Sequence, residues 1–332
     1  MRATIRITTL VFFALALVAC QDPATSGNNG VQDAAADTED ASSDSRADAS
    51  EDVSADTDED TESDDASSQI DMSPLGPEDR EAEVVIPEDY DPGQSYPLVF
   101  LLHGYTASAS VQDAYLMVSN QVDEYDFILV LPNGTRDSGG NRFWDATSWC
   151  CNFAGSPVDD AGYLEGLMDE AETRFSIDPA RIYFMGHSNG GFMSYRMACD
   201  YADRVAAVAS LAGSGFVDGE TCEASEPVAV LQAHGTMDTT IVYQGSAGQY
   251  PAAEELMERW ATRNGCDASS TEAGQLDLVT GSNGDETDVL EWQNCEDDAS
   301  VVLWKLNDAG HVPGLTGNFT TGVLDFLMAH ER

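Results

Sequence analysis

Ser188 occurs in a short glycine-rich segment whose pattern could turn a serine into a nucleophile. The segment Gly186-His187-Ser188-Asn189-Gly190 matches the pattern G-x-S-x-G. In this pattern a strand ends at a sharp turn that carries the serine, and a helix follows at once. The glycines are needed because the backbone crowds at the turn, and the N-terminus of the helix favours negative charge that develops near the serine. The alternative interpretation is a purely structural turn.

A serine hydroxyl is a weak nucleophile unless a general base takes its proton. We predict His311 as this base, because it lies in the loop Asn307–Gly314, just beyond the apolar run Val301–Trp304. The alternative is a surface histidine without a role. The other histidines fit less well because they lie at glycine turns, in a turn suited to a structural hydrogen bond, or near the C-terminus: His103, His187, His234 and His330.

The base in turn needs an acid that fixes its tautomer. We predict Asp238, which follows the apolar run Val228–Leu231, and Asp308 is the competing candidate. The chain order Ser188, Asp238, His311 is that of the α/β-hydrolases.

An oxyanion hole requires two N–H donors that converge on the developing charge. The backbone N–H of Asn189, directly after the serine, is one candidate. We predict the backbone N–H of Tyr105, in Leu102-His103-Gly104-Tyr105-Thr106, as the other, with Thr106 as the less favoured choice. The simpler interpretation of this second segment is a tight turn, and a turn and a donor can coexist.

The elements that must position these residues alternate between strand and helix patterns. Continuous apolar runs are typical of strands buried on both faces, and apolar residues at helical spacing indicate helices that pack on a sheet. We therefore predict an α/β-hydrolase fold, with a doubly wound, mostly parallel sheet and helices on both faces. The predicted strands are Ala82–Ile86, Pro97–Leu102, Phe127–Leu131, Arg181–Met185, Val205–Ala209, Val228–Leu231 and Val301–Trp304, and the predicted helices are Asp160–Phe175, Phe192–Cys199, Ala252–Arg263 and Phe319–His330.

The N-terminal residues predict export and a lipid anchor. Arg2 and Arg6 precede the apolar stretch Leu10–Ala19, which is too short to span a bilayer and ends at Cys20 like a bacterial lipobox. We therefore predict a signal peptide at residues 1–19, lipidation of Cys20 and a location on the cell envelope, with Gln21 favouring the outer membrane, or release to the exterior. The alternative is an ordinary signal peptide with a chance cysteine.

Residues 20–79 are predicted to be a disordered acidic tether, because their Asp, Glu, Ser, Ala and Thr cannot bury enough apolar surface to fold. Calcium binding by Asp56–Asp60 is a weaker alternative, since the segment lacks the glycine and glutamate of an EF-hand loop. Residues 80–332 are predicted to form one catalytic domain.

The net charge of the whole chain is −46, with 60 acidic and 14 basic residues, and most of the excess lies beyond the tether. Such acidity argues against nucleic acid and anionic membranes as partners, apart from the membrane contact through the lipid on Cys20. It also suggests function in saline water, where ions screen the repulsion.

The folded part resembles the secreted polyhydroxybutyrate depolymerase and feruloyl esterase group of α/β-hydrolases, often called carbohydrate esterase family 1. The resemblance implies ester hydrolysis through an acyl-enzyme, with the residues named above and with neither a cofactor nor a metal; we expect a monomer. It also favours a helix N-terminal role for Asp159 and Asp160. The stretches that carry it are Leu101–Gly104, Cys150-Cys151, Val158–Leu164, Gly186–Gly191, Ala198-Cys199, His234–Asp238, Asn264–Cys266 and Gly310-His311.

The chain departs from this family directly after the predicted base. The family commonly has Thr-Trp-Pro-Gly there, whereas this sequence has Val312-Pro313-Gly314 and so lacks the tryptophan that lies near the substrate. Trp144 and Trp149 could supply an aromatic wall for the substrate instead, or could be packed structural residues.

Seven cysteines are present, and six remain when Cys20 is set aside. An even number in an exported protein predicts disulfides. The resemblance implies the pairs Cys199–Cys222 and Cys266–Cys295, which leaves Cys150 and Cys151 for an uncommon bond between adjacent residues.

The sequence therefore predicts an exported serine esterase. Its expected substrates are feruloyl or acetyl esters of polysaccharides, or short-chain polyester oligomers of the polyhydroxybutyrate type. The alternatives are a serine peptidase of the prolyl-oligopeptidase type and a surface-binding lipoprotein without turnover.

Overall fold

A computed structural model describes residues 70–217, 222–282 and 284–332. The signal peptide at residues 1–19, the lipidated Cys20, the acidic segment Asp56–Asp60 and most of the tether lie outside the described residues. They therefore remain predictions from the sequence.

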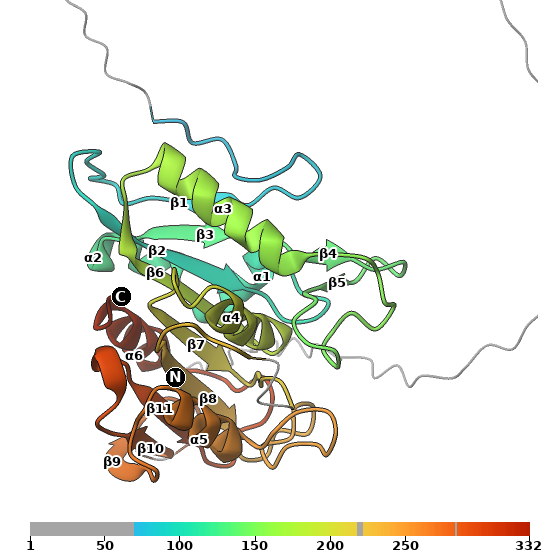
Figure 1. Ribbon diagram of the computed structural model, residues 1–332, viewed down its shortest axis with the longest axis vertical. Helices are drawn as coiled ribbons and strands as arrows, with labels where there is room; N and C mark the ends of the chain where they lie inside the picture. The colour runs from blue at the N-terminus through green and yellow to red at the C-terminus, as the bar shows by residue number, and fades with distance from the viewer. Residues whose placement is uncertain (1–69, 218–221, 283) are drawn as a thin grey trace, which may run out of the picture. The chain divides into compact units, whose positions relative to one another are not determined.

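A nine-stranded sheet forms the centre of the described part, in the order β1-β3-β2-β6-β7-β8-β11-β10-β9 (Figure 1). Neighbouring strands from β3 to β11 run parallel, whereas β1, β10 and β9 pair antiparallel with their neighbours at the two edges. The strands of this sheet are β1 (Glu83–Val85), β2 (Tyr96–Leu102), β3 (Ile128–Leu131), β6 (Ile177–His187), β7 (Ala207–Leu211), β8 (Ala229–Gly235), β9 (Thr271–Leu276), β10 (Thr287–Trp292) and β11 (Val301–Leu306). A small separate hairpin is formed by β4 (Thr135–Arg136) and β5 (Arg142–Phe143).

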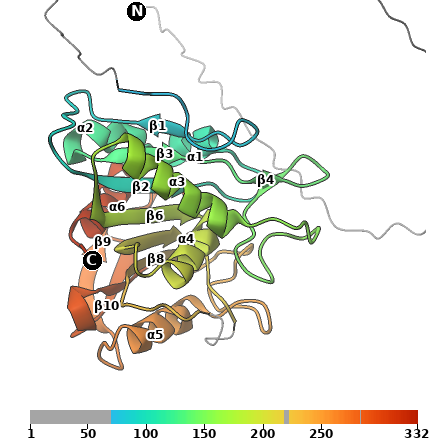
Figure 2. The ribbon, with the colours of Figure 1, turned by 45° about the horizontal axis from the view of Figure 1, so that its top comes forward.

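Helices cover both faces of the sheet, as Figures 1 and 2 show. Helices α3, α4 and α5 pack on one face, and α1, α2 and α6 pack on the other. Alternate residues of the central strands point to opposite faces, so Phe100 joins the first core and Leu101 the second, and both are fully buried. The helices are α1 (Ala109–Leu116), α2 (Val122–Tyr125), α3 (Asp160–Arg174), α4 (Asn189–Asp200), α5 (Ala253–Arg263) and α6 (Gly317–Met328), with short 3-10 turns at Ser119–Gln121 and Glu296–Asp298.

The predicted mostly parallel α/β-hydrolase sheet is confirmed, and its edges differ from the sequence prediction. Strands β9 and β10 were not predicted. β9 is exposed along its whole length and carries polar residues without alternation, so it has no strand pattern in the sequence. Helix α1 was also not predicted. Its buried face includes the polar Gln112 between Ala109 and Leu116, so the sequence lacks an apolar stripe there.

The folded part begins before residue 80, which corrects the boundary predicted from the sequence. Leu75 is fully buried and pairs with Ala82 through two backbone hydrogen bonds of 2.9 and 2.8 Å. The backbone N–H of Gly76 donates to Glu170 on α3. One buried leucine among proline, glycine and acidic residues gives no periodic pattern, so this attachment could not be recognised from the sequence.

Three disulfides are present: Cys199–Cys222 and Cys266–Cys295, which the resemblance implied, and Cys150–Cys151, the adjacent pair that these two left over. The first fastens the end of α4 to the segment before β8, and the second joins the turn after α5 to the turn after β10. None of the helices that the structure describes is long and apolar enough to cross a membrane.

Candidate active site

Ser188 sits between β6 and α4 in a strained turn. Its φ of 55° lies in the left-handed region, which costs a residue other than glycine about 1–3 kcal/mol. The flanking glycines are required by close approach: a Cβ on Gly190 would lie 2.1 Å from the carbonyl oxygen of Leu102, and one on Gly186 would lie 2.4 Å from the carbonyl carbon of Gly190. The sequence thus builds a turn that holds Ser188 at the carboxyl edge of the sheet.

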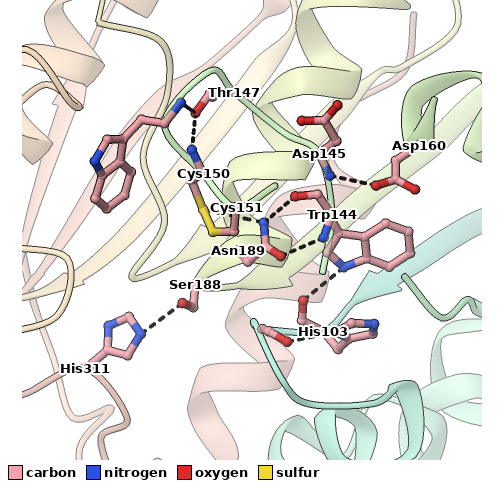
Figure 3. Close-up of a disulfide and its surroundings, with 12 residues drawn as sticks. His103, Trp144, Asp145, Thr147, Cys150, Cys151, Asp160, Ser188, Asn189 and His311 are labelled. Carbon is pink, nitrogen blue, oxygen red and sulfur yellow. Dashed lines mark hydrogen bonds between the residues drawn. A yellow bond between two sulfur atoms is a disulfide. The ribbon is translucent and has the colours of Figure 1, made fainter. Parts of the chain in front are cut away.

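His311 reaches Ser188 from the end of β11, and Asp238 reaches His311 from the end of β8, the neighbouring strand in the sheet. The Nε2 atom of His311 lies 2.9 Å from the Oγ of Ser188 (Figure 3). Its Nδ1 atom lies 2.7 Å from Oδ2 of Asp238. The competing candidate, Asp308, instead donates its backbone N–H to Thr236. The arrangement can move a proton from the serine hydroxyl to an oriented imidazole.

Asp238 is held as a carboxylate. Its side chain is buried, and its Oδ1 accepts the backbone N–H groups of Thr240 at 2.8 Å and Ile241 at 3.0 Å. Burial by itself would raise the pKa of Asp238, but the hydrogen bonds from His234 and His311 outweigh it and hold the pKa well below its usual range. A carboxylate accepts the Nδ1–H of His311 and so leaves the lone pair on Nε2 facing Ser188.

Two residues hold the His311 loop in place, and neither could be recognised from the sequence. The imidazole of His187 donates its Nε2–H to the carbonyl oxygen of His311 at 2.9 Å. The phenol of Tyr115 on α1 donates to the carbonyl oxygen of Pro313 at 2.8 Å. Burial lowers the pKa of His187 to about 4, so His187 is neutral near pH 7. Both contacts join residues that are far apart in the sequence.

The predicted oxyanion donors differ in the hydrogen bonds that their backbone N–H groups make. Thr106, the less favoured choice, donates its backbone N–H to the carbonyl oxygen of Arg142 at 2.8 Å and is therefore committed elsewhere. The N–H groups of Asn189 and Tyr105 remain the candidate pair. Asn189 occupies the first position of α4, where helical N–H groups have no partner within the helix.

The side chain of Asn189 has a second role that the motif does not reveal. It accepts the backbone N–H of Trp144 at 2.7 Å and donates to the carbonyl oxygen of the same residue at 2.9 Å. The amide also contacts Sγ of Cys150 at 3.5 Å, and Figure 3 shows Asn189 between this disulfide and Trp144. Asn189 therefore fastens the loop that carries Trp144 and the adjacent cysteines to the serine turn.

Trp144 does not form a wall for substrate, which corrects one of the two interpretations drawn from the sequence. Its side chain is fully buried, and its indole N–H donates to the carbonyl oxygen of His103 at 3.0 Å. Trp144 is therefore a packed structural residue, the other interpretation drawn from the sequence. Trp149 is half-buried and packs on Tyr250 with ring centroids 4.7 Å apart, so it stays a candidate for substrate contact.

Exposed apolar side chains neighbour the triad in the sequence. Met237 and Val312, directly before Asp238 and directly after His311, are each 62% exposed. Phe153, beyond the adjacent cysteines, is 64% exposed, and its ring packs edge-on against Tyr105 at 5.3 Å. Exposed apolar side chains of this kind are suited to contact with an apolar acyl or alcohol group. The sequence did not predict a role for these residues.

The two adjacent carboxylates at the start of α3, Asp159 and Asp160, have structural partners. Asp159 caps the helix by accepting the backbone N–H of Gly162 at 2.9 Å, as expected of an N-terminal charge. Asp160 is buried and pairs with Arg80 at 2.6 Å. Across the described residues, no group of three or more His, Cys, Asp or Glu side chains is arranged to hold a metal ion.

Known proteins match this chain over most of its described part. A family model described as putative esterase matches residues 73–301. The probable feruloyl esterase C of Aspergillus niger is 30% identical over 240 residues, which cover 70% of this chain and 76% of that protein. Feruloyl esterase B of Piromyces equi is 27% identical over 246 residues, which cover 71% of this chain but 43% of that longer protein.

The fold is also known from a solved structure. The acetyl xylan esterase from Aspergillus awamori superposes with a TM-score of 0.53 at 16% sequence identity, over 75% of this chain and 94% of that one. At this level of identity the likeness establishes the architecture of the sheet and helices.

Proposed function

Because the chain belongs to the putative esterase family and is a carboxylic ester hydrolase, we propose that Ser188, His311 and Asp238 are its catalytic triad. The observation that carries this proposal is the unbroken hydrogen-bond chain from the serine hydroxyl through the imidazole to a buried carboxylate, with distances of 2.9 and 2.7 Å. The strained turn that exposes Ser188 supports the same assignment.

Acylation begins when Nε2 of His311 takes the proton of the Ser188 hydroxyl while Oγ attacks the ester carbonyl carbon. The electron pair of the C=O bond moves to oxygen, and the backbone N–H groups of Asn189 and Tyr105 stabilise the resulting oxyanion. The intermediate collapses by breaking the C–O bond to the alcohol, which leaves with the proton from the His311 imidazolium. Asp238 stabilises that imidazolium.

Deacylation repeats these steps with water as the nucleophile. His311 takes one proton from the water as its oxygen attacks the acyl carbon. The second tetrahedral intermediate expels Ser188 Oγ, which recovers its proton from His311, and the carboxylic acid is released. The enzyme returns to its starting protonation state.

We propose feruloyl or acetyl esters of polysaccharides as the substrates, ahead of short-chain hydroxybutyrate oligomers. Two matched relatives carry the name feruloyl esterase. The exposed Phe153, Met237 and Val312 and the half-buried Trp149 supply apolar and aromatic surface for a planar acyl group. These side chains take the place of the tryptophan that is absent after His311.

We further propose that the protein is exported and anchored through a lipid on Cys20. Three disulfides support an oxidising compartment outside the cytosol. Mass spectrometry of the mature N-terminus would detect the acyl chains, and Cys20→Ala should release the protein from the membrane fraction. A mature protein that starts elsewhere and carries no lipid would refute the anchor.

The triad is tested by turnover of p-nitrophenyl acetate, p-nitrophenyl butyrate, methyl ferulate, hydroxybutyrate oligomers and a peptide amide. Ser188→Ala should lower kcat for the esters by about 10⁴-fold or more. Ser269→Ala, which removes the hydroxyl of an exposed serine, serves as the matched control and should keep wild-type turnover. Ester cleavage that persists in Ser188→Ala would refute the triad. Cleavage of the amide without the esters would favour a peptidase.

A further inference from the structure

Gln232 lies in the middle of β8 and is fully buried next to His234, whose ring lies 3.4 Å from the acid of the proposed triad. Its Oε1 accepts the hydroxyl of Tyr195 on α4 at 2.9 Å. Its Nε2 lies 2.9 Å from the carbonyl oxygen of Gly213 and 2.9 Å from Nδ1 of His234. The amide therefore connects α4, the segment after β7 and an imidazole that the proposed reaction does not use.

The carbonyl of Gly213 fixes the orientation of this amide. A carbonyl oxygen can only accept hydrogen bonds, so the atom of Gln232 that faces it must be the NH₂ group. The reverse orientation would place two acceptor oxygens against each other in the protein interior, where an unsatisfied pair is costly. Tyr195 can donate to the remaining oxygen and so satisfies it.

This orientation dictates the protonation of His234. The second N–H of the Gln232 amide points at Nδ1, which must accept it and so carries no proton. The single proton of the ring is then on Nε2, which donates to the carbonyl oxygen of Ile241 at 2.7 Å. The same Nε2 lies 3.4 Å from Oδ2 of Asp238, the oxygen that also accepts His311.

We propose that Gln232 is a positioning residue that keeps His234 neutral, so that the negative charge of Asp238 is available to His311 alone. A doubly protonated His234 would place a second cation against the same oxygen and would compete with the His311 imidazolium for it. The inference rests on the proposed triad, because it assigns a role to the neighbour of its acid.

The other titratable and charged groups around His234 come from several elements. The ring of Tyr243 packs edge-on against His234 at 5.6 Å, and Lys305 and Glu254 contact Tyr243 rather than the imidazole itself. His187 is neutral near pH 7, since its pKa is lowered to about 4 by burial. Within the described part of the chain, these groups include Tyr195, Tyr243, His187, His311, Asp238, Lys305 and Glu254.

A direct test is the ¹⁵N spectrum of the imidazoles in the wild-type protein labelled at histidine, with the signals of His234 assigned by their loss in His234→Gln. We expect these signals to show a neutral ring with its proton on Nε2 at about pH 8. A proton on Nδ1 would overturn the proposal. This readout requires no substrate and no substitution at Gln232.

The functional test replaces Gln232 by glutamate and measures the pH profile of p-nitrophenyl acetate hydrolysis. In this variant an acceptor oxygen replaces the donating NH₂ group, so Nδ1 gains a proton and donates a hydrogen bond to the new carboxylate, which stabilises His234 as a cation. A cation beside Asp238 competes with the His311 imidazolium for the same carboxylate oxygen and so disfavours protonation of His311. The acid limb of kcat/KM should therefore move down by about one pH unit, and kcat should fall about tenfold because the base is weaker.

Two comparisons make this result specific to His234. In the double variant Gln232→Glu/His234→Gln the acid limb should coincide with that of His234→Gln, because glutamine cannot take up the proton. Gln293→Glu adds the same charge at an exposed position and should leave the profile unchanged. An unshifted acid limb in a folded Gln232→Glu protein contradicts the proposal. If that variant fails to fold, the wild-type ¹⁵N spectrum decides.

Failure of the proposed triad gives a different result from failure of this inference. A wrong triad leaves Ser188→Ala active, whatever the protonation of His234. A wrong role for Gln232 leaves Ser188→Ala inactive, while the ¹⁵N spectrum or the acid limb departs from the expectation.

Discussion

Asn189 combines two functions that its position directly after Ser188 permits. Its backbone N–H is a candidate oxyanion donor, and its side-chain amide pairs with both backbone groups of Trp144. Since every substitution at this position except proline keeps the backbone N–H, the contribution of the side chain can be measured separately. The motif G-x-S-x-G leaves this residue unspecified, so its side-chain role is visible only in the structure.

Asn189→Ala should lower the free energy of unfolding by about 2 kcal/mol, because the buried N–H of Trp144 loses its partner, whereas its carbonyl keeps the hydrogen bond from the backbone N–H of Cys151. It should also reduce kcat, since the loop beside Ser188 loses its attachment. Urea unfolding and turnover of p-nitrophenyl acetate check both effects. Asn318→Ala removes an exposed asparagine from α6 and is the matched control. Unchanged stability in Asn189→Ala would show that the loop is held by other contacts.

Two buried histidines should make stability depend on pH. Burial lowers the pKa of His103 and of His187 to about 4 from the ordinary value of 6.5. The unfolded chain therefore takes up protons at a higher pH than the folded protein does. Their contribution is complete above about pH 6.5 and is lost as the pH falls to about 4, on the order of 3 kcal/mol for each histidine.

Unfolding in urea at a series of pH values between about 4 and about 7 measures this loss. His187→Gln removes one of the two titrating groups, and its stability should fall less steeply with decreasing pH than that of the wild type. Ser269→Ala leaves every histidine in place and serves as the control, and its dependence on pH should match that of the wild type. Identical slopes in His187→Gln and the wild type would contradict the assignment.

Whether a single residue's role could be predicted from the sequence depended on how far apart in the chain its contact partners lie. Ser188, Asp238 and His311 could be proposed because the local motif, the strand ends and the chain order each restrict the choice. The bond from His187 to His311 joins residues 124 positions apart and follows no motif. The environment of Trp144 was equally inaccessible, since a tryptophan pattern does not distinguish a packed ring from an exposed one.

At the scale of elements, the strands buried on both faces were predictable because their apolar runs are continuous. β2 is buried at every residue and extends one residue before its predicted start, whereas β7 begins two residues after its predicted start. The antiparallel edge strand β9 has no buried residue and therefore no pattern to detect. The parallel centre of the sheet, which positions the candidate site, is the part that the sequence predicted well.

The disulfide Cys199–Cys222 should stabilise the fold by restricting the unfolded chain. It closes a loop with a sequence separation of 23 residues, which corresponds to about 3 kcal/mol. The double variant Cys199→Ala/Cys222→Ala should lose this amount in urea unfolding at neutral pH.

The pair Cys266–Cys295 provides a matched comparison, because its separation of 29 residues is similar. Its double alanine variant should lose a nearly equal free energy, since loop entropy depends only weakly on length. A variant as stable as the wild type would mean that the cross-link leaves the unfolded chain unrestricted.

At the scale of the whole molecule, the dominant feature is a net charge of −46 on 332 residues. The basic residues near the site are already engaged: Arg80 pairs with Asp160, and Lys305, the only lysine of the chain, lies 3.6 Å from Glu254. Ion pairs of this kind are weakened by salt, but acidic residues greatly outnumber basic ones. Repulsion among the excess carboxylates is therefore the larger electrostatic effect, and screening should relieve it.

The stability of the protein should consequently rise with ionic strength. The free energy of unfolding in about 2 M KCl should exceed that in about 20 mM KCl, where the Debye length is several times longer. Chloride is the appropriate anion, because sulfate stabilises folded proteins generally through exclusion from their surface. Sucrose at equal osmolality controls for such exclusion, since it carries no charge. If the added stability were equal in sucrose and KCl, or absent in KCl, the acidic surface would have no adaptation to saline water. A gain specific to KCl would tie the composition of the chain to the medium in which it works.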